Sequence, residues 1–123
     1  MNNTFFTFKN LAVWQKSMDL AKEILKLFED CKNYAIRDQI MRSVISIPSN
    51  IAEWFERKTS KDFQHFLAIA RGSLSELETQ LILANSLNYI TNLQLWVFQW
   101  TIEEIAKMLW VLQKKEKIDS HRI

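Results

Sequence analysis

The stretch FQHFLAIARGSLSELETQLILA, residues 63–84, decides the fold of this 123-residue chain. Its apolar residues recur at alternating steps of four and three, the spacing that aligns side chains along one face of an α-helix. The resulting stripe consists of Phe63, Leu67, Ala70, Leu74, Leu77, Leu81 and Ala84. An apolar stripe of this length needs a partner surface, so the stretch predicts a long helix with a coiled-coil-like seam.

Three other segments carry the same helical period. Residues 10–31 align Trp14, Met18, Ala21, Leu25 and Phe28, residues 36–57 align Ile40, Val44, Ile47 and Ile51, and residues 92–115 align Phe98, Ile102, Ile105, Leu109 and Leu112. The helix built on the opening stretch is expected at about residues 60–89, with Thr59 or Ser60 as its cap, and Thr91 or Asn92 is expected to cap the last helix. Four helices with short links predict a single all-α domain over residues 1–123, an antiparallel up-down four-helix bundle.

The composition agrees with a folded protein of the cell interior. One Gly and one Pro in the whole chain favour few, long helices, and 48% hydrophobic residues suffice for one core. Cys31 is the only cysteine, which excludes an internal disulfide and favours a reducing cytoplasm. No apolar run reaches the length of a membrane span, so we expect a cytoplasmic protein without membrane contact.

No catalytic or metal-binding constellation is visible in the sequence. The two histidines, His65 and His121, have no second ligand at helical spacing. Acid–base chemistry by Glu53 and Glu76 would require a ligand-sized cavity beside them. We therefore expect no enzymatic activity, no metal, no cofactor and no small-molecule substrate.

The second predicted helix contains an unusual polar stripe. Beside its apolar stripe lie Gln39, Ser43, Ser46, Asn50, Glu53 and Arg57, and the third helix carries a comparable line of Ser73, Glu76 and Gln80. Pro48 lacks a backbone donor and displaces the carbonyl of Val44, so a kink or a local break is expected there. Either the two polar lines meet between the helices and satisfy the freed carbonyls, with Arg42, Arg57 or Arg71 as donors to the carboxylates, or they form a solvated face, which periodicity alone favours.

The segments LAVWQKSMDLAKEI and, above all, SIPSNIAE followed by IARGSLSELET resemble the bacterial 23S rRNA intervening-sequence (S23) proteins. The resemblance covers about residues 8–90, and the family is similar to the accessory variability proteins of diversity-generating retroelements. It implies homopentamers of antiparallel four-helix bundles and a role near RNA. The matching positions are Trp14, Gln15, Ser46, Pro48, Ser49, Asn50, Ala52, Glu53, Gly72, Ser73, Glu76 and Glu78.

Surplus apolar residues indicate a contact surface. Trp54 stands where the family usually has Gly, and we expect it to extend such a surface. A helical wheel places Trp96, Trp100 and Trp110 opposite the core stripe of the last helix, which indicates a subunit or partner interface. The alternative is that this helix is rotated or covered by the segment TFFTF, residues 4–8. A line of small residues, Ala68, Gly72, Ser75 and Thr79, would allow close helix approach, within the bundle or between subunits.

The net charge of +2, from 16 basic and 14 acidic residues, does not by itself indicate a nucleic-acid-binding protein. Local cations are nevertheless available for RNA, namely Arg37, Arg42, Arg57, Lys58, Lys61, Arg71, Lys114 and Lys115. Interleaved acids favour a solvated surface for any single cluster, whereas a homo-oligomer would repeat each cluster. The hypothesis is a non-enzymatic homo-oligomeric scaffold associated with RNA or another nucleic acid, and the alternative is a protein–protein adaptor without nucleic-acid affinity.

Overall fold

The computed structural model describes residues 6–57 and 63–121, the side chains of Phe63 and of residues 116–121 excepted. Within these ranges the regular structure is entirely helical. The elements are a short 3-10 helix η1 (Phe8–Asn10) and the α-helices α1 (Ala12–Phe28), α2 (Tyr34–Arg57), α3 (Phe63–Ser86) and α4 (Asn92–His121).

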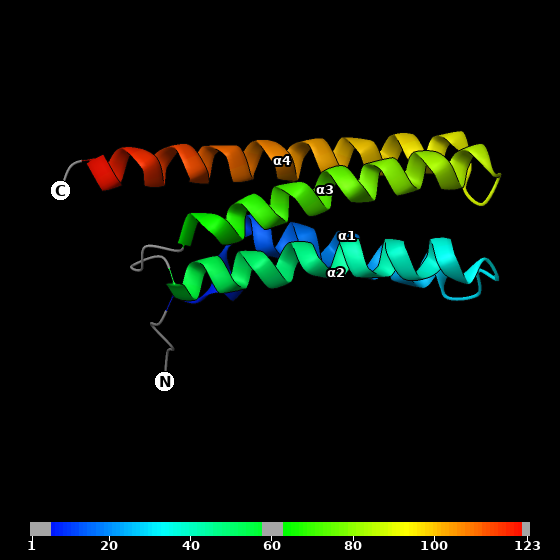
Figure 1. Cartoon of the computed structure of the whole chain (residues 1–123), viewed down its shortest axis with the longest axis horizontal. Helices are drawn as coiled ribbons and strands as arrows, with labels where there is room; N and C mark the ends of the chain where they lie inside the picture. The colour runs from blue at the N-terminus through cyan, green and yellow to red at the C-terminus, as the bar shows by residue number, and fades with distance from the viewer. Residues whose placement is uncertain (1–5, 58–62, 122–123) are drawn as a thin grey trace.

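The four α-helices run up and down as an antiparallel bundle (Figure 1). α1 and α2 form one layer and α3 and α4 the other, and both termini lie at the same end. Among the pairs of neighbouring α-helices, α2 and α3 pack against each other most extensively. α1 and α4 pack against each other least extensively. The predicted all-α four-helix bundle is confirmed. No helix in the described ranges combines the length and the apolar character needed to cross a bilayer.

Two helix starts follow from side-chain caps. The Ile36 amide donates to Oδ1 of Asn33 (3.3 Å), so α2 begins at Tyr34, two residues before the predicted start. The Gln94 amide donates to the Thr91 hydroxyl (3.1 Å) and the Gln94 side chain accepts from the Thr91 amide (2.8 Å). This capping box confirms Thr91 as the cap of α4. The predicted caps of α3, Thr59 and Ser60, lie outside the described residues.

The other helix ends differ from the predictions by several residues. α3 ends at Ser86 because Asn88 adopts a left-handed conformation with φ 66°, which lets the Tyr89 amide donate to the Ala84 carbonyl (2.9 Å). α1 begins only at Ala12, since η1 precedes it, and ends at Phe28. α4 continues to His121, beyond the predicted end at residue 115, and extends past the start of α3 in Figure 1.

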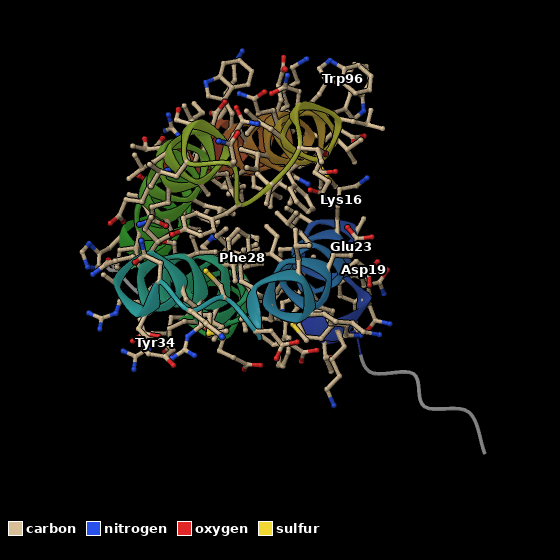
Figure 2. The ribbon with its side chains drawn as sticks, turned by 90° about the vertical axis from the view of Figure 1, so that its right-hand side faces the viewer. Lys16, Asp19, Glu23, Phe28, Tyr34 and Trp96 are labelled. Carbon is tan, nitrogen blue, oxygen red and sulfur yellow. The ribbon has the colours of Figure 1, made fainter. Side chains whose placement is uncertain are left out.

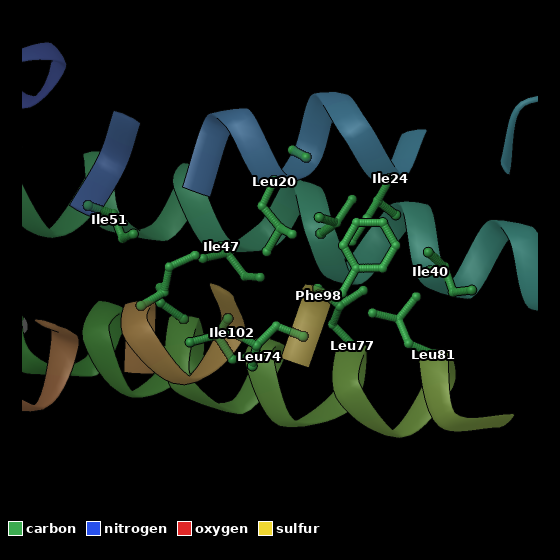
Figure 3. Packing of buried hydrophobic residues seen from close by; sticks show 14 of the residues in the cluster. Leu20, Ile24, Ile40, Ile47, Ile51, Leu74, Leu77, Leu81, Phe98 and Ile102 are labelled. Carbon is green, nitrogen blue, oxygen red and sulfur yellow. The ribbon is translucent and has the colours of Figure 1, made fainter. Parts of the chain in front are cut away.

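The core is built from the predicted stripes of α2, α3 and α4, which meet in the centre of the bundle (Figure 3). The fully or almost fully buried residues on these stripes are Ile40, Val44, Ile47, Ile51, Leu67, Ala70, Leu74, Leu77, Leu81, Ala84, Phe98, Ile102, Ile105 and Leu109. Leu112 is only half-buried. The four–three periodicity therefore identified the inward faces of three helices.

The predicted stripe of α1 is only partly right, because Ala21 and Phe28 on this stripe are buried in the core but Trp14, Met18 and Leu25 are not. Val13, Leu20 and Ile24 are buried in the core, whereas Trp14 and Met18 are only half-buried. α1 is apolar on two adjoining faces that share Ala21 and Phe28, and the core uses the face that also carries Leu20 and Ile24. The other face borders an apolar groove between α1 and α2.

Replacement of Leu77 by Ala is expected to lower the free energy of unfolding by about 2–5 kcal/mol, because the side chain is fully buried and its removal leaves a cavity. Leu83→Ala in the same helix is the matched control, since Leu83 is half exposed and should change stability by no more than about 0.5 kcal/mol. Urea denaturation followed by circular dichroism measures both. Equal effects would contradict the assigned inward face of α3.

Candidate functional site

Serine and asparagine side chains meet between α2 and α3. The Ser73 hydroxyl donates to Oγ of Ser46 (2.8 Å), and the Asn50 amide nitrogen donates to the same oxygen (3.0 Å). Ser43 and Ser73 are buried. The two polar lines therefore meet at this point, and the solvated-face interpretation is wrong for the middle of the stripe. It holds at the stripe's ends, where Gln39 and Arg57 are exposed.

Pro48 is buried inside α2, and the helix continues through it from Tyr34 to Arg57. The expected local break is thus wrong, while a bend at Pro48 stays a prediction. Ser49 donates to the Ile45 carbonyl (2.8 Å) and Asn50 to the Ser46 carbonyl (2.7 Å). The acceptors are the two carbonyls that follow Val44. The polar residues therefore support the backbone next to the Val44 carbonyl, which receives no backbone hydrogen bond from Pro48.

The carboxylates of the two polar lines have different surroundings. Glu53 accepts a hydrogen bond from Arg57 (2.6 Å), whose guanidinium lies over the Phe66 ring at 5.5 Å. Glu76 is exposed on α3. Neither carboxylate lines the groove between α1 and α2 or the groove between α3 and α4 that is described below. Across the described residues, no three His, Cys, Asp or Glu side chains gather in a way that could hold a metal ion.

Trp54 does not contribute to a contact surface. Its side chain is 3% exposed and belongs to the core cluster, where its ring packs edge-on against Phe55. The prediction that Trp54 extends an apolar interface is therefore wrong. A large indole at the place of the family glycine is accommodated by turning inward rather than outward.

The candidate cations do not form one patch. Arg37 lies near the start of α2, and Arg57 at its other end, so the length of the bundle separates them. Both are neutralised locally, Arg37 by Asp38 (3.1 Å) and Arg57 by Glu53. Arg42 is exposed and forms no ion pair with another described residue. Lys58 and Lys61 lie outside the described residues.

Three further candidate cations lie on α3 and near the end of α4. Arg71 donates to the side-chain oxygen of Gln113 (2.9 Å), and Lys114 and Lys115 follow Gln113 along α4 but project in other directions around the helix. The Lys114 ammonium lies 4.8 Å from the centre of the Trp110 ring, and Lys115 is exposed. We call Arg71, Lys114 and Lys115 the α3–α4 basic cluster, because they are the predicted cations carried by α3 and by the end of α4.

The tryptophans of α4 are exposed as predicted. Trp96, Trp100 and Trp110 expose 59%, 60% and 53% of their surface, and Figure 2 shows Trp96 pointing away from the bundle. The centroids of the Trp96 and Trp100 rings lie 6.0 Å apart. α4 is thus not rotated to hide these rings.

The described part of the N-terminal segment lies elsewhere. Phe6 packs against Phe55 of α2 (6.0 Å between centroids), and Phe8 against Trp14 of α1 (5.2 Å). Residues 6–8 therefore do not cover the tryptophans of α4.

A groove of about 780 Å³ runs between α3 and α4 beside these tryptophans. Ala68, Gly72 and Ser75 line it from α3, and Trp96 and Trp100 from α4. A Cβ atom at Gly72 would have no atom within 4 Å. The small-residue line therefore does not serve packing inside the bundle. Sequence reasoning found this line but not the groove, because the groove depends on the separation of two helices.

These features define an antiparallel four-helix bundle with a hydrogen-bonded polar seam, a basic cluster and an exposed tryptophan face. Residues 9–111 match the family model of the 23S rRNA-intervening sequence proteins, and the chain belongs to this family. The predicted resemblance is confirmed.

Among solved structures, the chain is similar to a protein with unknown function from the S23 ribosomal protein family of Bacteroides thetaiotaomicron. The two are 33% identical with a TM-score of 0.76, over 84% of this chain and 99% of the other. No curated protein matches the chain.

Replacement of Ser73 by Ala is expected to lower the free energy of unfolding by about 0.5–1.5 kcal/mol, because it removes the buried hydrogen bond to Ser46. A double-mutant cycle with Ser46→Ala isolates the coupling between the two hydroxyls. The exposed Ser75→Ala is the control and should be nearly neutral. A coupling energy of zero would contradict a seam held together by this bond.

Gly72→Ala is expected to raise the free energy of unfolding by about 0.5–1 kcal/mol, since alanine favours the helix and its Cβ meets no neighbour. Thermal denaturation of the dilute protein measures the change. Destabilisation would show that Gly72 packs against another part of the same chain.

Proposed function

We propose that the protein is a non-enzymatic homo-oligomeric bundle that acts as an RNA-associated scaffold. Membership of the 23S rRNA-intervening sequence protein family is the observation that carries the proposal. The family resemblance favours a pentamer as the oligomer. A scaffold of this kind acts by holding RNA and its own copies in a fixed arrangement.

The α3–α4 basic cluster offers the most suitable contact for phosphate. A cation that is already paired with a carboxylate must break that pair before it binds phosphate, which disfavours Arg37 and Arg57. Arg71 has a neutral partner, and Lys115 forms no ion pair with another described residue. Their donors are therefore available to phosphate oxygens.

Repetition of the cluster compensates for its small size. The chain carries a net charge of only +2, so one copy attracts RNA weakly. In an oligomer, each bound phosphate raises the effective concentration of RNA at the clusters of the other copies. The proposal therefore makes RNA affinity depend on assembly.

Single-stranded RNA is expected to bind with an affinity that falls as salt rises, with a log–log slope of about −0.7 for each phosphate contacted. Lys115→Ala should weaken binding and reduce the magnitude of the slope, whereas Lys26→Ala on the exposed face of α1 should change neither. Fluorescence anisotropy of labelled RNA at several salt concentrations measures both. Salt-insensitive binding, or no binding, would contradict the proposal.

The exposed tryptophans favour a second candidate function, a protein–protein adaptor without affinity for RNA. Light scattering with and without ribonuclease separates the two functions. An RNA scaffold gains mass with RNA at low salt. An adaptor instead keeps a partner protein after nuclease treatment and loses it on Trp100→Ala.

A further inference from the structure

The outer face of α4 carries a regular stripe of exposed residues. Starting at Trp96, they recur at steps of four, three, four, three and four, the period of a helix–helix contact. The stripe consists of Trp96, Trp100, Glu103, Lys107, Trp110 and Lys114, and every member is exposed. The core residues Phe98, Ile102, Ile105 and Leu109 occupy the other side of α4. α4 therefore has a second face, and residues 6–57 and 63–115 leave it exposed.

This stripe is complementary to itself when reversed. Its order is symmetric about residue 105, so an antiparallel copy would place Glu103 opposite Lys107, Trp100 opposite Trp110 and Trp96 opposite Lys114. Opposite charges would face each other twice around the symmetry axis. Lysine over an indole already occurs within one chain, where Lys114 lies 4.8 Å from the Trp110 ring.

A parallel copy would not be complementary. It would place Glu103 against Glu103 and Lys107 against Lys107, and like charges in direct contact oppose association. The charge order thus selects the antiparallel arrangement. Two identical surfaces that match after reversal form an isologous contact with two-fold symmetry.

The groove between α3 and α4 has room for the side chain that this pairing delivers. Trp100 borders the groove. In the antiparallel pair, Trp110 of the second copy lies opposite Trp100, so the indole of that Trp110 would lie over the groove floor. Gly72 forms part of that floor, and a Cβ atom there would have no atom within 4 Å beyond its chain neighbours and the backbone of its own helix. Glycine is unfavourable inside a helix, and an approaching tryptophan gives it a packing role. Symmetry repeats this insertion on the other copy.

We propose that α4 pairs antiparallel with α4 of a second copy about a two-fold axis near residue 105, with Trp110 of each copy seated in the α3–α4 groove of the other. The inference rests on the proposed self-association but not on the proposed RNA contact. A two-fold contact of this kind joins copies in pairs, so in a pentameric assembly it would link two rings.

Charge reversal tests the contact without disturbing the fold, because Glu103 and Lys107 are 67% and 76% exposed. Glu103→Lys creates two repulsive pairs across the axis, and Lys107→Glu does the same. Each single variant should raise the dissociation constant of self-association by about tenfold or more. The double variant restores both attractive pairs and should recover an affinity close to that of the wild type. Sedimentation velocity over a concentration series measures all three, with circular dichroism as a check on folding.

Glu23→Lys is the matched control, since it makes the same charge change on the exposed face of α1. Unchanged association in both single variants would overturn the contact. A double variant no better than the singles would overturn the antiparallel register, and a wild-type monomer at every concentration would overturn the pairing as a whole.

Cross-linking tests the register directly. In a Cys31→Ser background, Glu103→Cys protein mixed with Lys107→Cys protein should form a disulfide between the two, because these positions face each other across the axis. Each protein alone should cross-link far less. A preference for 103–103 and 107–107 links would overturn the antiparallel arrangement.

RNA binding is measured on the same variants to keep the two proposals apart. Association lost on charge reversal, together with absent RNA binding in the wild type, supports the α4 contact and contradicts the RNA scaffold. Salt-dependent RNA binding with association insensitive to charge reversal supports the scaffold and overturns the α4 contact. A Gly72→Leu variant adds a third readout, since a large side chain in the groove should weaken association.

Discussion

The close packing of α2 against α3 is the constraint on which the rest of the structure depends. Their seam buries the longest apolar stripe of the chain and also encloses serine hydroxyls, which are costly to bury unless they are hydrogen-bonded. The bond between Ser46 and Ser73 satisfies this requirement only when the two helices keep one register, because a shift by a turn of either helix separates the hydroxyls. Pro48 lies in the same stretch, and its neighbours Ser49 and Asn50 support the surrounding backbone with side-chain bonds. We infer that this seam specifies alignment, while the leucines and isoleucines supply most of the stability.

The other two helices complete the core on this pair and leave their outer faces free. α4 shows this separation most clearly, since its isoleucines and leucine face inward while its tryptophans and its Glu103–Lys107 pair face outward. The exposed ion pair contributes little to stability in water. Changes on the outer face of α4 therefore act on association with other molecules more than on folding, and the reverse holds for its inner face. The groove beside Gly72 belongs to the outer face, because the exposed Trp96 and Trp100 border it.

Helical periodicity predicted the bundle and three of its four core stripes because leucine and isoleucine occupy one face of α2, α3 and α4. It was only partly right for α1. The predicted Phe28 is buried, but Trp14 and Met18 repeat at the same period as Leu20 and Ile24, and only packing decides between the two faces. Trp54 was misplaced because it was judged by the family glycine at its position, although it continues the stripe of Ile47 and Ile51 at the next step of three. The contact between Ser46 and Ser73 was proposed from the spacing of polar residues along the two helices. How deeply this contact is buried depends on how closely α2 approaches α3. The groove was not predicted, because it depends on the distance between α3 and α4, and the sequence carries no signal of that distance.

Assembly and RNA binding are linked if both proposals hold. A net charge of +2 gives a single copy little attraction for RNA, and half of the described cations considered for RNA are either paired with an acid or engaged with a ring. Binding then relies on clusters repeated over several copies, so RNA favours the assembled form and assembly raises the affinity for RNA. Thermodynamic linkage makes the two effects equal in free energy. Salt weakens the phosphate contacts and also the Glu103–Lys107 pairs across α4, whereas the packing of Trp110 in the α3–α4 groove is apolar and far less sensitive to salt. At high salt the protein would therefore release RNA before its copies separate. A scaffold held together by RNA alone would not keep its copies together after the RNA is released.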